Sequence, residues 1–391
     1  MSAPKPRRAR VRRTSKWGPM AALGIKMMFH DRAKLAGTLL GVVFATVLMA
    51  QQLGVLLGLL YKNTQFVDNT ACDIWIAPPG TAQLQPGSPV PLSALTQARV
   101  TEGVAWAEPL LFGGASVRRS DGGTEAVTLV GSTLPRLAGG PWAMVAGEPD
   151  AVADPSAIVF EDSARDELGG LDLGSVAELS GHRVVARGFT WGLLPFGPSY
   201  AFGSEPTVRD ILRIPVDQAS YVLVGVEPGA DVEAVAARLQ DAFGDDLDVI
   251  TRAGFHDRIV RDLVAAQLGI SFGTSTAFAL IVGFVIVALS MFSSVVDNVR
   301  EFGTLKAIGA STFDLTKLLL VQAVVYALVG STVGLFLATR MAEGIRSPNL
   351  SLVLPPELFA ATYVAMTILC AVASALAILR VKNLEPAMVF R

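Results

Sequence analysis

Three histidines and two cysteines are the side chains that would most readily bind a transition metal or serve as a base or nucleophile. His30, His182 and His256 lie far apart in the sequence, without the short spacing that zinc ligands use. No serine or cysteine pairs with a histidine in a recognisable catalytic pattern, although a triad could still assemble in space. We therefore expect no catalytic residue, no metal site and no bound cofactor in this chain.

The composition is that of a membrane protein. Hydrophobic residues make up 51% of the 391 residues, charged residues 17%, and the mean hydropathy is +0.49. Four stretches contain no Asp, Glu, Lys or Arg, and each is long enough to cross about 30 Å of hydrocarbon as a helix. They are Leu35–Leu60, part of Leu263–Val296, Leu318–Thr339 and Leu358–Leu379. Carriers coupled to protons or ions normally keep charges inside the membrane, so that class is disfavoured.

The distribution of Lys and Arg predicts the side of the membrane on which each segment lies. Residues 1–34 hold ten basic residues and one acidic residue, whereas residues 61–262 hold 14 basic and 27 acidic residues. We therefore place both termini in the cytoplasm, with a multi-pass chain in the membrane and the acidic segment outside. The basic leader is interpreted as a topology signal beside the lipids, not as a nucleic-acid-binding tail.

A charged segment, residues 297–317, separates the second and third apolar runs and falls in the cytoplasm on this topology. Its pattern predicts a short amphipathic helix that can insert an apolar face into a groove of a soluble partner. An interfacial helix anchored among lipid headgroups is the alternative. The apolar face would comprise Phe302, Leu305 and Ile308, and the polar face Arg300, Glu301 and Lys306.

The apolar run before this segment is longer than a bilayer requires, since residues 263–296 would extend about 50 Å as a helix. Phe255, Ile259 and Leu263 continue an i, i+4 stripe upstream of it. We expect one helix that protrudes outward as a rigid stalk and links the outer domain to the cytoplasmic segment.

Small residues along the apolar runs predict close helix packing, either within one chain or between two copies. The GxxxG pairs are Gly37 and Gly41, Gly54 and Gly58, Gly269 and Gly273, and Gly330 and Gly334. A further amphipathic helix, Ser15–Arg32, is expected to lie in the membrane interface.

The outer segment is long enough for one or two folded domains. Strands are predicted at residues 72–77, 111–119, 125–131, 157–160, 183–186, 220–226 and 247–251, and helices at 92–100 and 232–243. The aromatic stretch Trp191–Phe202 is predicted to be a loop, packed on its own domain or facing a partner. Cys72 outside the membrane and Cys370 within it cannot pair on this topology.

The predicted fold class is an α-helical membrane protein with four transmembrane helices and a large α+β extracytoplasmic domain inserted between helices 1 and 2. The expected order is a basic leader with an interfacial helix (1–33), helix 1 (34–61), a periplasmic α+β domain of two subdomains (62–252), the stalk and helix 2 (253–296), the cytoplasmic helix and loop (297–317), helix 3 (318–339), a short outer loop (340–357), helix 4 (358–379) and a cytoplasmic tail (380–391).

This order of parts resembles the FtsX-like/MacB-type family of ABC transporter permeases. The cytoplasmic segment matches the family pattern at Arg300, Glu301, Gly303, Leu305, Lys306, Ala307, Gly309, Ala310 and Ser311, and the C-terminal end matches it at residues 384–387. Leu39–Leu60 followed by Asp73–Pro79, and residues 224–239 followed by 247–255, are most similar to the DevC-type branch.

The resemblance implies that residues 297–317 form a coupling helix that docks on a cytoplasmic ABC ATPase, with Arg300, Glu301, Phe302, Leu305, Lys306, Ile308 and Gly309 as the coupling residues. It also implies a homodimer and a periplasmic membrane-fusion adaptor, with an outer-membrane channel beyond it. The sequence contains no G-x-x-x-x-G-K-[S/T] phosphate loop. ATP and Mg²⁺ are therefore expected on a separate ATPase chain, and not on this one.

Two functions fit the resemblance. The first is the permease of an ATP-driven exporter, or of a system that releases lipoproteins. The second is an FtsX-like regulator or scaffold that activates a periplasmic partner. The large outer domain favours the exporter, since the regulator branch generally has a smaller one.

Overall fold

The computed structural model describes residues 24–29, 31–85, 87, 89–119, 121–193, 197–265, 267–344 and 352–382. The chain divides into two compact units. The first, here called the helical unit, comprises Met1–Gly54, Phe272–Gly344 and Leu352–Arg391. The second, here called the α/β unit, comprises Val55–Ser271 and Ile345–Ser351. Residues 1–23 of the predicted leader and interfacial helix (1–33), the motif at 384–387 and most of the predicted tail (380–391) lie outside the described residues.

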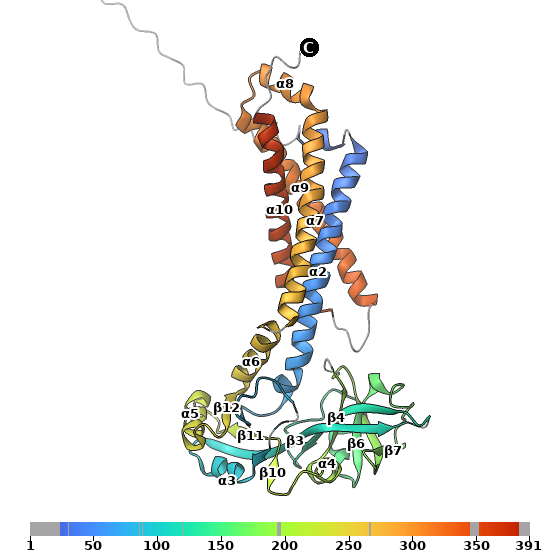
Figure 1. The fold of residues 1–391 in the computed structure, drawn as a ribbon, viewed down its shortest axis with the longest axis vertical. Helices are drawn as coiled ribbons and strands as arrows, with labels where there is room; N and C mark the ends of the chain where they lie inside the picture. Colours follow the sequence, from blue (N-terminus) through green and yellow to red (C-terminus); the bar gives the residue numbers. More distant parts are fainter. Residues whose placement is uncertain are drawn as a thin grey trace, which may run out of the picture. The chain divides into compact units, whose positions relative to one another are not determined.

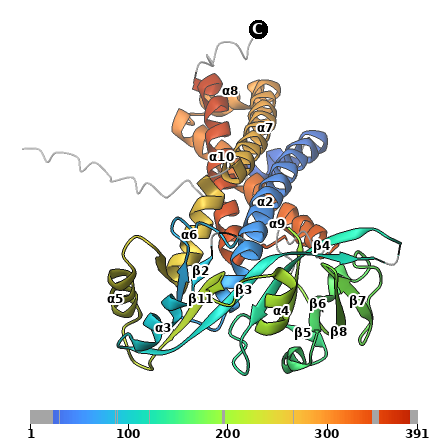
Figure 2. The same ribbon diagram turned by 60° about the horizontal axis from the view of Figure 1, so that its bottom comes forward.

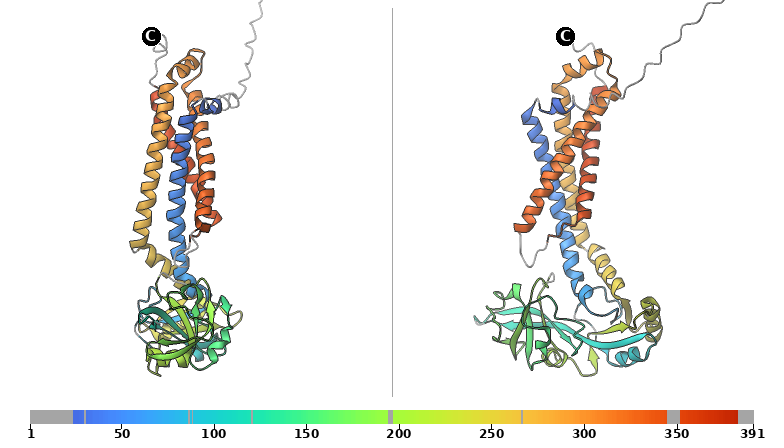
Figure 3. Two further views of the ribbon diagram at one scale, coloured as in Figure 1. Left: turned by 90° about the vertical axis from the view of Figure 1, so that its right-hand side faces the viewer. Right: turned by 180° about the vertical axis from the view of Figure 1, so that it is seen from behind.

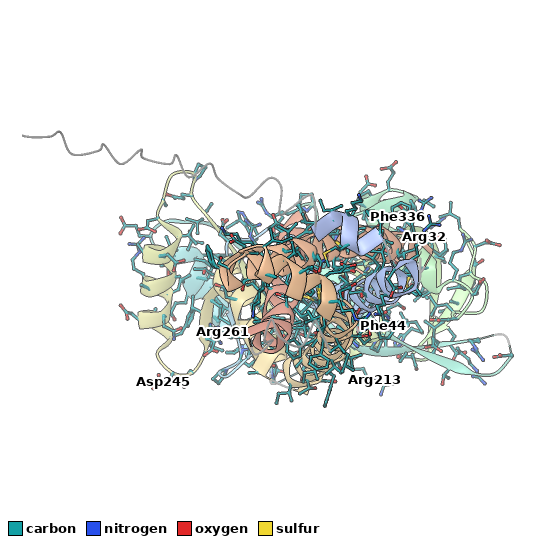
Figure 4. The ribbon with its side chains drawn as sticks, turned by 90° about the horizontal axis from the view of Figure 1, so that it is seen from above. Arg32, Phe44, Arg213, Asp245, Arg261 and Phe336 are labelled. Atoms are coloured by element: carbon teal, nitrogen blue, oxygen red, sulfur yellow. The ribbon has the colours of Figure 1, made fainter. Side chains whose placement is uncertain are left out.

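The helical unit is built from long helices that run side by side (Figures 1 and 3). They belong to α2 (Arg32–Asn69), α7 (Gln267–Asp297), α9 (Thr312–Gly344) and α10 (Pro356–Lys382), with the short α8 (Val299–Ala307) between α7 and α9. Four helices in the described part of the chain are long and apolar enough to cross a membrane: Arg32–Asn69, Leu268–Asp297, Phe313–Gly344 and Pro356–Ala375. Their outward faces carry exposed apolar rings such as Phe44 and Phe336, labelled in Figure 4, as expected for surfaces that lipid can cover.

Glycines bring the helices of this unit close together. A Cβ atom at Gly330 would lie 2.4 Å from the side chain of Val42 in α2, and one at Gly41 would lie 2.3 Å from Ile286 in α7. Gly334 meets Thr46 in the same way, and Gly54 meets Leu354. These four glycines therefore pack within one chain, as small residues do in membrane bundles.

The other predicted glycines differ. No atom lies within 4 Å of a Cβ built at Gly37 or Gly273, so neither contacts a neighbouring helix of this chain; Gly58 is a residue of α2. At Gly269 a Cβ would lie 2.0 Å from the carbonyl oxygen of Val264. The atoms nearest to Gly269 therefore belong to Val264, five residues earlier, and the role of Gly269 in helix packing stays a prediction.

The α/β unit holds one large mixed sheet and flanking helices (Figures 1 and 2). Its helices are α3 (Ser93–Val100), α4 (Glu205–Leu212), α5 (Val232–Phe243) and α6 (Arg252–Ala265), with 3-10 turns at Pro149–Ala153 and Asp162–Ala164. Its strands are β1 (Ile74–Ala77), β2 (Val90–Pro91), β3 (Val104–Arg118), β4 (Thr124–Ser132), β5 (Met144–Ala146), β6 (Ala157–Glu161), β7 (Val176–Leu179), β8 (His182–Thr190), β9 (Ser199–Ser204), β10 (Gln218–Ala219), β11 (Tyr221–Val226) and β12 (Asp248–Thr251).

One half of the sheet has the strand order β12-β1-β11-β3, with neighbouring strands antiparallel. In chain order these elements read β1-α3-β3 and β11-α5-β12, the split βαβ arrangement of ferredoxin-like folds. Helices α3 and α5 cover one face through a core that includes Ile74, Ala98 and Leu239. Alternation along β1 explains this layering, since Ile74 and Ile76 face α3 and α5 while Trp75 faces the opposite core.

The other half is inserted between β3 and β11. Here β3, β4, β9, β6, β8 and β7 pair in succession, and β7 pairs again with β3, so the strands close into a ring. Side chains such as Leu129, Phe160 and Val184 fill its interior. Closing the ring pairs strand edges that would otherwise be exposed.

The predicted fold class is confirmed: four candidate membrane helices, with a mixed α/β domain between the first and the second. The predicted loop Trp191–Phe202 is wrong in its second part, because residues 199–202 form buried strand β9 between β4 and β6. The Gly and Pro of this stretch suggested a loop, but burial against two strands determines the structure.

The structure places the apolar stripe of the predicted stalk in the α/β unit. Phe255, Ile259 and Leu263 are buried in its core, so the stripe holds α6 against its own domain. Helix α6 ends at Ala265 and α7 begins at Gln267; residue 266 lies outside the described residues. That residues 253–296 form one continuous rod therefore stays a prediction.

Candidate functional site

The charged segment between the second and third apolar runs forms a compact connection at the end of the helical unit where α2 begins (Figures 1 and 3). Helix α7 ends at Asp297, α8 spans Val299–Ala307, and α9 already begins at Thr312. The first turns of α9 therefore take up the end of the segment predicted as 297–317.

The end of α8 is fixed by its glycine. Gly309 has a φ of +102°, its amide donates to Lys306 O at 3.0 Å, and the amide of Ala310 donates to Leu305 O at 2.9 Å. This pair of hydrogen bonds is a Schellman motif, which requires a left-handed residue and so favours glycine. Ala310 and Leu305 complete the motif by packing against the same hydrophobic core.

The start of α9 is fixed by a reciprocal cap. The carboxylate of Asp314 accepts hydrogen bonds from the amide and the hydroxyl of Ser311, at 3.1 and 2.7 Å. In return, the Ser311 hydroxyl accepts from the amide of Asp314 at 3.2 Å. This arrangement satisfies amides that a helix N-terminus would otherwise leave unpaired. Residues Gly309, Ala310 and Ser311 thus end α8 and begin α9.

The position of Phe302 corrects the predicted apolar docking face. Its side chain is 1% exposed and belongs to the core of the helical unit, and Leu305 is partly buried against the same core. Of the three residues assigned to that face, Ile308 points outward and is 84% exposed. The helical periodicity correctly placed Phe302 and Leu305 on one face, but that face packs on α7 and α9 of this chain.

The outward surface of the connection combines Ile308 with a residue that the sequence analysis did not select. Phe313, in the first turn of α9, is 67% exposed, and its ring lies 4.3 Å from the ammonium group of Lys317. Arg300 and Glu301 are exposed on α8 beside them, and Lys306 is half-buried. A large apolar residue two positions after the Ser311 cap is the signal that could have identified Phe313. We call Arg300, Glu301, Ile308 and Phe313 the coupling surface.

Two contacts anchor this connection to the rest of the helical unit. Lys34, near the start of α2, forms an ion pair with Asp297 at the end of α7. Asp31 accepts a hydrogen bond from the amide of Lys34 at 3.1 Å, which lowers the pKa of the Asp31 carboxyl. Residues 24–29, the described part of the predicted interfacial helix, are helical, and Gln322 of α9 donates to Gly24 O at 3.0 Å.

In the α/β unit, the end of α2 and helix α6 reach the same aromatic core. Phe66 of α2 packs against Trp75, Phe112, Trp142 and Tyr200, with ring centroids 5.3–6.3 Å apart. Phe255 of α6 packs edge-on against Trp75 at 5.4 Å. Paired aromatic rings of this kind add about 0.5–1.5 kcal/mol beyond their area burial. Trp75 therefore contacts rings from both α2 and α6.

A buried carboxylate holds the segment after β8. Glu161 has no solvent-exposed surface, and its oxygens accept hydrogen bonds from the Thr190 hydroxyl and the Gly192 amide, each at 2.7 Å. The carbonyl of Gly192 accepts from the ammonium of Lys62 in α2, at 2.5 Å. A buried charge needs such partners, and here they attach the β8–β9 connection to the helix.

The titratable residues considered for catalysis do not converge. His256 faces Asp68 at 2.9 Å, and His182 faces Asp210 at 3.4 Å, both near the surface. Burial raises the pKa of the Cys72 thiol, and Cys72 and Cys370 are both unpaired. Within the described residues, no group of three or more His, Cys, Asp and Glu side chains could hold a metal ion.

Comparison with protein families identifies both units. Residues 35–242 match the MacB-like periplasmic core domain, and residues 273–386 match the FtsX-like permease C-terminal domain. Uncharacterized ABC transporter permeases of Mycobacterium tuberculosis and Mycobacterium bovis are 26% identical over 361 residues, which cover 90% of this chain and 93% of theirs. A Methanocaldococcus jannaschii ABC transporter permease is 30% identical over 133 residues, a third of each chain.

Among solved structures, the periplasmic region of MacB from Actinobacillus actinomycetemcomitans aligns with 51% of this chain and 96% of its own, at 9% identity and a TM-score of 0.38. The extracellular domain of the noncanonic ABC-type transporter YknZ from Gram-positive bacteria aligns with 46% of this chain and 98% of its own, at 14% identity and a TM-score of 0.33. The match to the MacB-like core covers more than half of the sequence. The chain belongs to the family of ABC transporter permeases that combine a MacB-like periplasmic core domain with an FtsX-like permease domain.

Proposed function

We propose that this chain is the permease subunit of an ATP-driven exporter, and that its coupling surface docks on the ABC ATPase that such permeases require. The observation that carries the proposal is the exposure of Ile308 and Phe313 on a connection whose other large apolar residues, Val299, Phe302 and Leu305, pack in the core. An exposed apolar pair on a rigid support is what a groove of a soluble partner can grip.

Coupling requires that a movement of α8, caused by the ATPase, is transmitted to the membrane helices and not lost in a flexible connection. Phe302 and Leu305 attach α8 to the core shared by α7 and α9, and the ion pair of Lys34 and Asp297 attaches α2. The Schellman turn and the Ser311 cap leave little freedom between α8 and α9. Of the predicted coupling residues, Arg300, Glu301, Lys306 and Ile308 are proposed to meet the ATPase. Phe302, Leu305 and Gly309 are proposed to hold the shape of the connection.

The proposed assembly is a homodimer in a bacterial inner membrane, with both termini and residues 297–317 in the cytoplasm and the α/β unit in the periplasm. The excess of basic residues in 1–34 and the excess of acidic residues in 61–262 support this orientation. ATP and Mg²⁺ would bind the ATPase chain, because this sequence has no phosphate loop. A membrane-fusion adaptor, with an outer-membrane channel, would receive the substrate.

The docking surface can be tested by co-purification of the full-length chain with an ABC ATPase encoded in the same gene cluster. Ile308→Asp and Phe313→Asp should each abolish the complex and leave the thermal midpoint of the permease unchanged, since both side chains are exposed. Val216→Asp, at an 81% exposed site in the α/β unit, is the matched control and should retain the complex. A complex that survives the Ile308 and Phe313 substitutions would show that docking occurs elsewhere.

A further inference from the structure

An open groove of about 620 Å³ lies within the α/β unit, on the outer side of the strand ring. Phe112 of β3, Thr128 of β4 and Tyr200 of β9 line its floor, while Asn63 of α2, Leu84 and Ile259 of α6 also line it. This volume falls in the range of pockets that hold small ligands. Its lining residues are remote in sequence from residues 297–317.

The floor of the groove is a row of residues across three strands. Gly114 of β3 pairs with Thr128 of β4, and Thr128 pairs with Tyr200 of β9. Directly paired residues share one face of a sheet. Two residues further along these strands, Phe112, Val130 and Phe202 lie on the same face of the sheet and are buried in the core around Phe66. The groove begins next to these core residues, at the row of Gly114, Thr128 and Tyr200.

Gly114 leaves the row open. No atom lies within 4 Å of a Cβ built at this position, so the missing side chain makes space that the protein does not fill. Ser116 and Ala126, the next pair on this face, are also small and line the groove. Gly114, Ser116 and Ala126 therefore form a flat surface of small residues beside the rings of Phe112 and Tyr200, and a flat molecule can lie on it.

Tyr200 and Thr128 both line this space. Tyr200 is 6% exposed, yet its hydroxyl forms no hydrogen bond with any described residue, and the Thr128 side chain likewise forms none within the described part of the chain. Burial of the phenol also raises its pKa, so Tyr200 keeps its proton at neutral pH. The hydroxyl of Tyr221, by contrast, donates to Gln85 O at 2.8 Å. Hydroxyls that the fold leaves unpaired are available to a ligand.

The lining indicates the chemistry of that partner. The described residues that line the groove include no Asp, Glu, Lys, Arg or His, although the surrounding domain is acidic. A charged ligand would lose its hydration here without a counter-charge. The amide side chains of Asn63, Gln83 and Gln85 and the hydroxyls of Ser116, Thr128 and Tyr200 can form neutral hydrogen bonds instead. The amide groups of Asn63 and Gln83 already donate to Leu59 O and to the Asp262 carboxylate, so their carbonyl oxygens are left for a ligand.

We propose that this groove is a binding site for a neutral carbohydrate of one or two rings. The C–H face of a sugar ring would pack on Tyr200 and Phe112, as apolar faces do on aromatic rings. Its hydroxyls would pair with those of Thr128 and Tyr200, two residues that are paired directly on neighbouring strands β4 and β9. An acyl chain would leave these hydroxyls unpaired. The site would give the periplasmic domain a ligand of its own, independent of docking at the coupling surface.

The test uses the full chain in nanodiscs, because maltoside detergents would supply a competing sugar headgroup. Binding of neutral N,N′-diacetylchitobiose is compared by calorimetry with that of chitobiose, the same disaccharide with free, cationic amines. The neutral sugar should bind at least tenfold more tightly. Gly114→Phe should remove binding by covering the flat surface of small residues, and its φ outside the left-handed region allows the substitution. Val216→Phe adds the same ring at an exposed site and should leave binding unchanged.

The variants Tyr200→Phe and Thr128→Val test whether a loss of sugar binding in Gly114→Phe results from misfolding. Each removes one hydroxyl without a protein partner, so the thermal midpoint should stay constant while affinity falls about fivefold. The proposal fails if diacetylchitobiose does not bind, if the cationic sugar binds more tightly, or if these variants bind as the wild type does. It also fails if a neutral blocked peptide, acetyl-trialanine amide, binds here in preference to the sugar.

Discussion

The amide of Ala310 donates a hydrogen bond across 2.9 Å to the carbonyl oxygen of Leu305 and thereby fixes the point at which α8 ends. The glycine between these partners takes a φ of +102°, which reverses the chain toward α9. The residues that match the family pattern here are therefore not all contact residues. Gly309, Ala310 and Ser311 determine the shape of the connection, and their neighbours supply its exposed surface.

Substitution of Gly309 by alanine should strain this turn. A Cβ would meet no neighbouring atom, so the cost arises from the left-handed backbone alone, about 1 kcal/mol. Gly309→Ala should lower the thermal midpoint and weaken ATPase binding, and Gly309→Asn should do so less because asparagine tolerates this region. Gly37→Ala is the control: Gly37 lies in α2 with open space around it, and alanine favours helix. Equal effects at both glycines would contradict the cap.

Phe302 and Ile308 should respond in opposite ways to truncation. Phe302→Ala leaves a cavity in the core of the helical unit and should lower the free energy of unfolding by about 3 kcal/mol. Ile308→Ala removes a side chain that is 84% exposed and should leave stability within about 0.5 kcal/mol, while ATPase binding weakens. Thermal unfolding and pull-down of the ATPase separate the two effects. An Ile308 variant with full binding would exclude this residue from the coupling surface.

The membrane helices could be predicted from the sequence because a charge-free run of more than 20 residues has few other stable structures. Helix 232–243 and strand 220–226 were found nearly to the residue, since their periodicity and turn residues agree. Strand β9 was missed because its burial comes from β4 and β6, which lie far away in the sequence. No local pattern carries that information.

In residues 297–317, too, the features set by local sequence could be predicted and those set by distant contacts could not. Its helical character and charges were visible in the sequence, and so was the shared face of Phe302 and Leu305. Whether that face meets a partner or the chain itself depends on α7 and α9, which local periodicity does not reveal. Phe313 was overlooked because it belongs to the helix after the turn. The groove at Gly114 could not be foreseen either, since it is defined by pairing across three strands.

Glu161 should be sensitive even to an isosteric change. Its two oxygens accept from donors that include the Thr190 hydroxyl, the Gly192 amide and the Ser163 hydroxyl. Glu161→Gln would place an NH₂ group against some of these donors and leave them unsatisfied, which costs about 2 kcal/mol in the free energy of unfolding. Glu178→Gln, on a carboxylate that is 47% exposed, should change stability by less than about 0.5 kcal/mol. Similar thermal midpoints for both variants would argue against a structural role for the buried carboxylate.

Cys72 should make the stability of the α/β unit depend on alkaline pH. Its thiol is 3% exposed, and burial raises its pKa in the folded state. Below about pH 8.5 the thiol is protonated in both states, so it contributes no pH dependence. Above that value the unfolded thiol loses its proton while the folded one retains it. Unfolding is then favoured by up to about 1.4 kcal/mol for each further pH unit.

This dependence can be measured by denaturant unfolding between pH 7.5 and 9.5 in a Cys370→Ala background, followed through tryptophan fluorescence, to which the buried Trp75 contributes. Cys72→Ala should flatten the profile in that interval, since alanine does not titrate and tyrosines ionise only at higher pH. Maleimide should label Cys72 in denaturant and not in the folded protein at pH 7.5, because the thiolate is the reactive form. Rapid labelling of the folded chain, or a profile that Cys72→Ala leaves unchanged, would show that this thiol is neither buried nor linked to stability.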